Sequence, residues 1–171
     1  GYLANKTESP PLFHGRLLRN TAKNSASNSL PFAKGPLGLI SICIDPEGEK
    51  TGNLFWDHFE FCAIVDGIDA IAGSCGVSRV RLSGNVWIGC LGLNSGPETQ
   101  TKDICHDITY MACKVLSLAL ANGWTTTCAV DFEKIVCGQN WNNTFDIFGP
   151  EIRNVLRIVT GTRQPSGLYV S

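Results

Sequence analysis

The chain has 171 residues, of which 43% are apolar and 17% charged, a composition that suits one globular domain with a substantial core. Its 14 basic and 15 acidic side chains give a net charge of −1, so we expect no nucleic-acid partner. No apolar run approaches the roughly 20 residues that cross a bilayer, and we expect no direct membrane contact by this piece. Because the chain begins at Gly1 and not at Met, we expect a piece of a longer protein, whose membrane anchoring the sequence leaves unknown.

Eight cysteines are spread along the chain without a C-x-x-C pair or a paired Cys/His clamp, which disfavours a zinc site. The even count leaves disulfides open. However, cysteines such as Cys43 and Cys137 lie in apolar runs, where a reduced thiol acts as a small hydrophobe. We therefore predict a reducing compartment, on the cytoplasmic side.

The first 38 residues are rich in Ser, Asn, Pro, Lys and Thr, which predicts a polar linker or arm before a folded domain over residues 39–171. The domain is expected to begin with a strand over residues 39–44. This run is rich in β-branched residues and is stopped by Asp45 and Pro46, which places the Asp45 carboxylate at a strand end.

The next part of the chain predicts a helix and then a hairpin. A helical pattern covers residues 54–72. Strands are predicted over residues 77–83 and 86–93, and Gly84-Asn85 between them is typical of a hairpin turn.

The second half begins with the clearest helix, over residues 101–122, where apolar residues recur at helical spacing and Gly123 marks the end. After it the patterns predict a strand over 125–130 with its return over 134–137, a strand over 144–148, a helix over 150–160 and a closing strand over 167–170. This order predicts an α+β fold with helices packed on one face of a mainly antiparallel sheet.

Four short segments carry a more specific pattern. They are I-D-P-E-G at residues 44–48, R-V-R-L-S-G-N-V-W at 79–87, F-D-I-F-G at 145–149 followed by Arg157, and a T-G to G-L-Y-V-S close over 160–171. In that order they resemble the A-D-I-x-G-F-T, K-I-K-T-I-G-D-x-Y, Y-D-I-W-G and T-G-x-x-G-x-I-x-V-S segments of the class III nucleotidyl cyclase catalytic domain, the domain of adenylyl and guanylyl cyclases. The resemblance implies a ferredoxin-like cyclase homology domain over residues 39–171, a degenerate member that lacks the family's final hairpin.

The resemblance also implies a reaction, the conversion of a nucleoside triphosphate to a 3′,5′-cyclic monophosphate and pyrophosphate at a dimer interface. In the family, two aspartates of one subunit hold two divalent ions, which neutralise phosphates and help a ribose hydroxyl to lose its proton. Asp45 matches the first aspartate, whereas the neutral amide of Asn85 stands at the second. We therefore expect Asp45 as a metal ligand, Asn85 at a degraded ligand position, and Mg²⁺ or Mn²⁺ held mainly by a partner domain.

Base and phosphate contacts are implied by the same resemblance. Asp146 and Arg81 match the base-binding positions, and an acceptor beside a donor complements the edge of adenine. Arg157 matches the arginine that stabilises charge on the transferring phosphate. Arg153 stands where the family has a ribose-orienting asparagine, and residues 131–134 replace the family's H-x-G-P turn.

The same residues have plain structural interpretations. Asp45 can cap a turn, and Asn85 after Gly84 is explained by hairpin chemistry alone. The arginines can be solvated faces of a strand and a helix. Asp146 is different, because a carboxylate inside an apolar strand needs a partner.

Two functions remain open from these residues. In the first, the chain supplies the adenine- and phosphate-binding half of a dimeric site that converts ATP to cyclic AMP in intracellular signalling, as a homodimer or a heterodimer with another cyclase domain. It is then an enzyme only when paired with a metal-competent partner. In the second, it is an inactive pseudocyclase that serves in dimerisation or nucleotide sensing.

Overall fold

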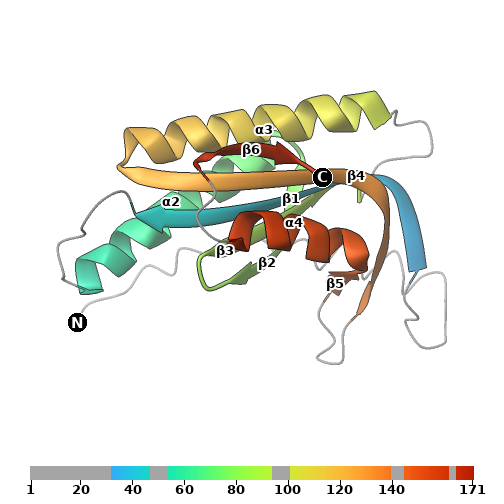
Figure 1. The fold of residues 1–171 in the computed structure, drawn as a ribbon, viewed down its shortest axis with the longest axis horizontal. Coiled ribbons are helices and arrows are strands. Elements are labelled where there is room, and N and C mark those ends of the chain that lie inside the picture. Colours follow the sequence, from blue (N-terminus) through green and yellow to red (C-terminus); the bar gives the residue numbers. More distant parts are fainter. Residues whose placement is uncertain (1–31, 47–53, 94–100, 140–144, 162–164) are drawn as a thin grey trace, which may run out of the picture.

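A computed structural model describes residues 32–46, 54–93, 101–139, 145–161 and 165–171, which form three helices and six strands (Figure 1). The helices are α2 (Leu54–Ser74), α3 (Thr101–Ala121) and α4 (Pro150–Thr160). The strands are β1 (Phe32–Pro46), β2 (Val77–Ser83), β3 (Val86–Leu91), β4 (Trp124–Gln139), β5 (Phe145–Phe148) and β6 (Gly167–Val170).

The six strands make one sheet in the order β2-β3-β1-β4-β5, and β6 pairs with β4. The β4–β6 pair is parallel and the other pairs are antiparallel. The long strands β1 and β4 pair along their length at the centre of the sheet, from Phe32 opposite Cys137 to Pro46 opposite Trp124. This arrangement confirms the predicted α+β class and its mainly antiparallel sheet.

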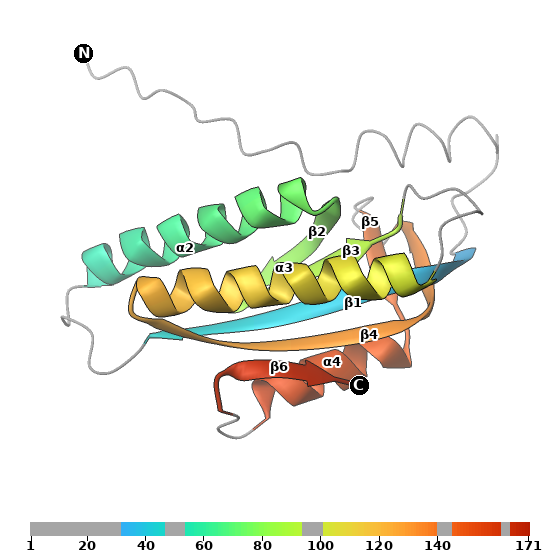
Figure 2. The same ribbon diagram turned by 90° about the horizontal axis from the view of Figure 1, so that it is seen from above.

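The helices lie on both faces of the sheet, with α2 and α3 on one face and α4 on the other (Figure 2). Side chains alternate along β1, so that Ile40 and Ile42 join the core under α2 and α3 while Leu39 and Cys43 join the core under α4. The sequence predicted helices on one face only. The second face needs a cover because β1 is apolar on both sides, and the buried stripe of α4 supplies it.

β4 is one continuous strand where the sequence predicted two. The predicted strand over residues 125–130 and its predicted return over 134–137 are successive parts of β4, and both pair with β1. Residues 131–134, interpreted from the sequence as an altered turn, therefore lie inside a strand. The physical reason is the length of β1, whose 15 residues offer β4 a hydrogen-bonding partner well past the point where the apolar pattern is interrupted.

β1 itself begins at Phe32, so residues 32–38 belong to the sheet and not to the predicted arm. The rest of that arm, residues 1–31, lies outside the described residues. The Gly84-Asn85 turn between β2 and β3 is present as predicted, and Gly84 has a φ of +59°, a conformation that favours glycine.

α3 is long and apolar enough, from Lys102 to Ala121, to cross a membrane by length and composition. A core helix of a soluble domain passes the same test, and α3 buries Ile104, Ile108 and Val115 against the sheet. All eight cysteines are free thiols, and Cys43, Cys90, Cys128 and Cys137 are buried.

Candidate functional site

Two candidate residues meet where β1 ends and β3 begins, in a group that we call the β1–β3 corner (Cys43, Asp45 and Asn85). The Asn85 amide nitrogen Nδ2 donates to Asp45 Oδ1 at 3.0 Å and to the backbone oxygen of Ile44 at 3.2 Å. Both neighbours are acceptors, so the nitrogen and not the oxygen of the amide must face them. The side chains of Asp45 and Asn85 are exposed.

The second carboxylate oxygen of Asp45 faces a thiol. The Sγ atom of Cys43 lies 3.5 Å from Asp45 Oδ2 and donates to it. Burial, together with the neighbouring Asp45 carboxylate, raises the pKa of the Cys43 thiol from 9.0 to about 11. Cys43 therefore stays protonated at neutral pH, as a neutral donor beside Asp45.

The β1–β3 corner does not fit a divalent cation as it stands. Mg²⁺ and Mn²⁺ need several oxygen ligands, and a protein site for them usually includes more than one carboxylate. Here Asp45 is the one carboxylate of the corner, and Asn85 turns a donor toward it where a second ligand oxygen is needed. Within the described ranges, no group of three or more His, Cys, Asp or Glu side chains converges on one point.

The two base-binding candidates form an ion pair, which we call the β2–β5 pair (Arg81 and Asp146). Arg81 Nη2 donates to Asp146 Oδ1 at 2.5 Å and to Oδ2 at 2.6 Å. The backbone N–H of Ile147 also donates to Asp146 Oδ1, at 2.9 Å. Side-chain exposure is 13% for Asp146 and 41% for Arg81, so the carboxylate is buried behind a guanidinium that remains open to solvent. The partner that the sequence required for Asp146 is thus Arg81.

The β2–β5 pair also shapes the sheet. β2 and β5 stand at opposite ends of the strand order, yet one side chain from each meets in a direct ion pair. The two end strands must therefore curl toward each other. This brings together residues 65 positions apart in the sequence.

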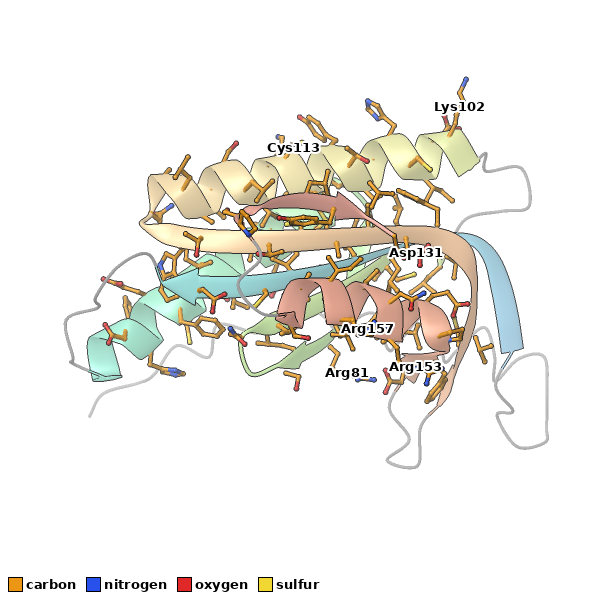
Figure 3. The ribbon with its side chains drawn as sticks, viewed as in Figure 1. Arg81, Lys102, Cys113, Asp131, Arg153 and Arg157 are labelled. Carbon is orange, nitrogen blue, oxygen red and sulfur yellow. The ribbon has the colours of Figure 1, made fainter. Side chains whose placement is uncertain are left out.

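Arg153 and Arg157 project from the exposed side of α4 (Figure 3). Four positions apart, they lie on the same side of the helix, away from its buried stripe. In the part of the chain that the structure describes, neither is joined to the β2–β5 pair by an ion pair or hydrogen bond. Both guanidinium groups are therefore accessible to an anionic ligand from outside the domain.

Two further residues that make polar contacts were missed from the sequence. Cys43 was interpreted only as a small core residue, although its thiol also faces Asp45. Asp69 of α2 binds side chains from both strands of the β2–β3 hairpin. Its acidic character inside an apolar helical segment was the available signal, but no local spacing identifies its partners.

No family model matches the sequence, and no curated protein matches it either. Solved structures do match. The guanylate cyclase domain of RhGC from Catenaria anguillulae, in complex with GTP, has a TM-score of 0.62 at 14% identity, covering 85% of this chain and 80% of that one. The adenylyl cyclase CyaB from P. aeruginosa has a TM-score of 0.61 at 13% identity, covering 85% and 79%.

A third match is a non-canonical dimeric guanylyl cyclase domain of the RhoGC fusion protein from the aquatic fungus Blastocladiella emersonii. Its TM-score is 0.57 at 13% identity, and the alignment covers 85% of this chain and 82% of that one. The chain therefore has the fold of the class III nucleotidyl cyclase catalytic domains, the fold that the sequence segments resemble.

Proposed function

We propose that this chain is a cyclase homology domain that supplies the adenine- and phosphate-binding half of a dimeric site for ATP, while a partner domain holds the metal ions. The observation that carries the proposal is the contrast between its two polar groups. The β2–β5 pair has one donor side chain and one acceptor side chain at a partly open edge, whereas the β1–β3 corner has one carboxylate already bound by an amide.

The base side of the proposal rests on Arg81 and Asp146. Adenine presents an exocyclic amino donor next to a ring-nitrogen acceptor, so it pairs with an acceptor and a donor held side by side. Asp146 and Arg81 offer that combination, and their charges cancel. A neutral pair suits a neutral heterocycle, because binding then leaves no uncompensated charge behind.

The phosphate side rests on Arg157, with Arg153 beside it. In the proposed reaction a ribose hydroxyl oxygen forms a bond to the α-phosphorus, the bond to pyrophosphate breaks, and the hydroxyl proton passes to water. Negative charge moves onto the departing pyrophosphate as that bond breaks. An always-charged, forked guanidinium stabilises such charge, and both side chains are exposed on α4, where a neighbouring subunit could present a nucleotide.

The metal side is assigned to the partner domain. A divalent ion at the β1–β3 corner would meet a single carboxylate and the amide hydrogens of Asn85. Loss of a ligand carboxylate from a catalytic metal site costs several kcal/mol of transition-state stabilisation, on the order of 3 kcal/mol. Mg²⁺ or Mn²⁺ would therefore be held by the aspartates of another cyclase domain.

The test is cyclic AMP formation from ATP in Mn²⁺, with the chain alone and mixed with a metal-competent cyclase domain. We expect activity of the mixture above that of the partner alone, and no activity of the isolated chain. Arg157→Ala should lower the activity gained in the mixture about 100-fold, because it removes a transition-state contact. Lys102→Ala, an exposed cation on α3, is the matched control and should change nothing.

A second candidate function, a pseudocyclase, is favoured by a separate observation. Arg81 Nη2 donates to both oxygens of Asp146, so the two candidate base contacts already bind each other without a ligand. A domain of this kind would keep the fold for dimerisation or nucleotide sensing and catalyse nothing. Absence of any gain in the mixture, together with formation of a dimer or binding of ATP, would select this function.

A further inference from the structure

Asp69 joins α2 to both strands of the β2–β3 hairpin. Its Oδ2 atom accepts from Arg79 Nη1 of β2 at 2.6 Å, and its Oδ1 atom accepts from Trp87 Nε1 of β3 at 2.8 Å. The Asp69 side chain is 8% exposed, the Arg79 side chain 20%, and Trp87 is fully buried. Each oxygen of this buried carboxylate therefore accepts a hydrogen bond from a different strand of the hairpin.

The packing around Trp87 holds this network in one arrangement. Arg79 stands opposite Gly89 in the β2–β3 ladder. The far edge of the Trp87 indole lies where a side chain on Gly89 would begin, so the ring covers that glycine closely. With the ring seated there, its N–H has one direction in which to donate, toward Asp69.

The two residues that bind Asp69 lie close in sequence to two candidate site residues. Arg79 precedes Arg81 by two positions on β2, and Trp87 follows Asn85 by two positions on β3. The ladder is irregular between Arg79 and Arg81, which breaks the strict alternation of side chains at this point. An irregularity of this kind changes the direction of the side chains that follow it, so the anchored Arg79 bears directly on where the Arg81 guanidinium lies.

We propose that Asp69 is a positioning residue, which fixes the β2–β3 hairpin on α2 so that Arg81 meets Asp146 and Asn85 meets Asp45. Asp69 touches neither group and acts through Arg79 and Trp87. The expected effect of Asp69 on nucleotide affinity rests on the proposed function. Its effect on the positions of Arg81 and Asn85 does not rest on that function.

The first measurement is NMR of the whole chain, using the side-chain Nε–H signal of Arg81 and the side-chain amide signals of Asn85. Asp69→Asn keeps an acceptor for Trp87 but removes the charge that holds Arg79. We expect both reporter signals to shift or broaden in this variant. Asp66→Asn, which removes an exposed acid three positions earlier on the same helix, should leave them unchanged. A role limited to stability would lower the melting temperature and leave the reporter signals of the folded state in place, which would overturn the proposal.

The second measurement is ATP affinity by calorimetry, with the same three proteins. Asp69→Asn should weaken binding about tenfold and Asp66→Asn should not. If the unsubstituted chain binds no ATP, the proposed function fails while the NMR result still decides the role of Asp69. If the chain binds ATP and Asp69→Asn binds it equally well with unshifted signals, the role of Asp69 fails alone.

A second variant, Arg79→Gln, covers the case in which Asp69→Asn does not fold. Arg79→Gln removes the link to β2 without leaving a buried carboxylate unbound, because Trp87 still donates to Asp69. It should reproduce the shift of the Arg81 signal. Where Asp69→Asn folds, the combined variant should show little more than either single change, since both break one contact. An unshifted Arg81 signal in a folded Arg79→Gln protein contradicts the proposal.

Discussion

The β1–β3 corner and the β2–β5 pair each place one carboxylate beside one nitrogen donor, but the donors differ in charge. Arg81 brings a full positive charge to Asp146, whose side chain is 13% exposed. Asn85 brings only a dipole to Asp45, which is exposed to water. A buried acid requires a cation, whereas an exposed one is stabilised by solvent. The β2–β5 pair therefore has no net charge, which suits a neutral base. The β1–β3 corner has one exposed negative charge, which is not enough to hold two divalent ions.

The comparison predicts that the β2–β5 pair contributes more to stability than the β1–β3 corner. Arg81→Met should lower the free energy of unfolding by about 2 kcal/mol, because Asp146 is left without its cation; the 41% exposure of Arg81 keeps the loss below that of a fully buried pair. Urea unfolding measures the change. Arg153→Met, on the exposed side of α4, is the control and should be nearly silent. Equal effects of Arg81→Met and Arg153→Met would show that Asp146 does not depend on Arg81 for its stability.

The hairpin turn between the two groups should show the next largest effect. Gly84 has a φ of +59° and no neighbour where a side chain would begin, so Gly84→Ala meets backbone strain and no clash. The expected loss is about 1.5 kcal/mol of unfolding free energy. Gly84→Asn should lose much less, because asparagine tolerates this conformation. A larger loss of unfolding free energy for Gly84→Asn than for Gly84→Ala would mean that the turn is crowded, which contradicts the structure.

Asn85→Asp tests the corner directly. Two adjacent carboxylates repel each other, so without divalent ions the variant should lose roughly 1 kcal/mol of stability at neutral pH. Added Mn²⁺ should raise its melting temperature above that of the variant in chelator, because the ion binds only the folded form. The unsubstituted chain should show no such rise. A Mn²⁺-dependent rise in the unsubstituted chain would show that the corner binds metal as it is.

The smallest expected effect comes from the buried thiols. They change the stability of the protein only in alkaline solution. Burial raises the pKa of Cys43 from 9.0 to about 11 and that of Cys128 from 9.0 to about 12. A raised thiol pKa means that the folded state keeps a proton that the unfolded state releases. The stabilising contribution is therefore complete below pH 9.0 and is lost as the pH rises through 11 to 12.

Unfolding curves at a series of pH values, with Cys43→Ala/Cys128→Ala as the comparison, measure this loss. The unsubstituted chain should lose stability faster above pH 9 than the double variant. Parallel curves for the two proteins would mean that neither thiol is protected in the folded state.

Much of the fold follows from patterns local in the sequence. The apolar spacing of Ile104, Ile108 and Met111 predicted α3, and Gly84-Asn85 predicted the hairpin that the structure contains. The length of β4 did not follow, because residues 131–134 interrupt the apolar pattern and only pairing with the similarly long β1 carries the strand through them. The side of α4 did not follow either, since it depends on which apolar face α2 and α3 leave uncovered.

The sequence predicted which residues belong to the candidate site, but not which of them contact each other. Asp146 in an apolar strand indicated that a partner exists, but the meeting with Arg81 depends on the curl of a whole sheet between β2 and β5. The direction of the Asn85 amide depends on two acceptors from β1, 40 and 41 positions away in the sequence. Long-range geometry of this kind has no signature in one sequence.

The central claim is that this chain contributes nucleotide contacts and no metal ligands. The most direct measurement mixes it with a cyclase domain that keeps both metal-binding aspartates but whose own base-contacting side chains have been replaced by alanine, and follows cyclic AMP formation in Mn²⁺. We predict product in the mixture, none from either protein alone, and none with Asp146→Ala in this chain. A mixture that forms a complex and yields no product would contradict the claim.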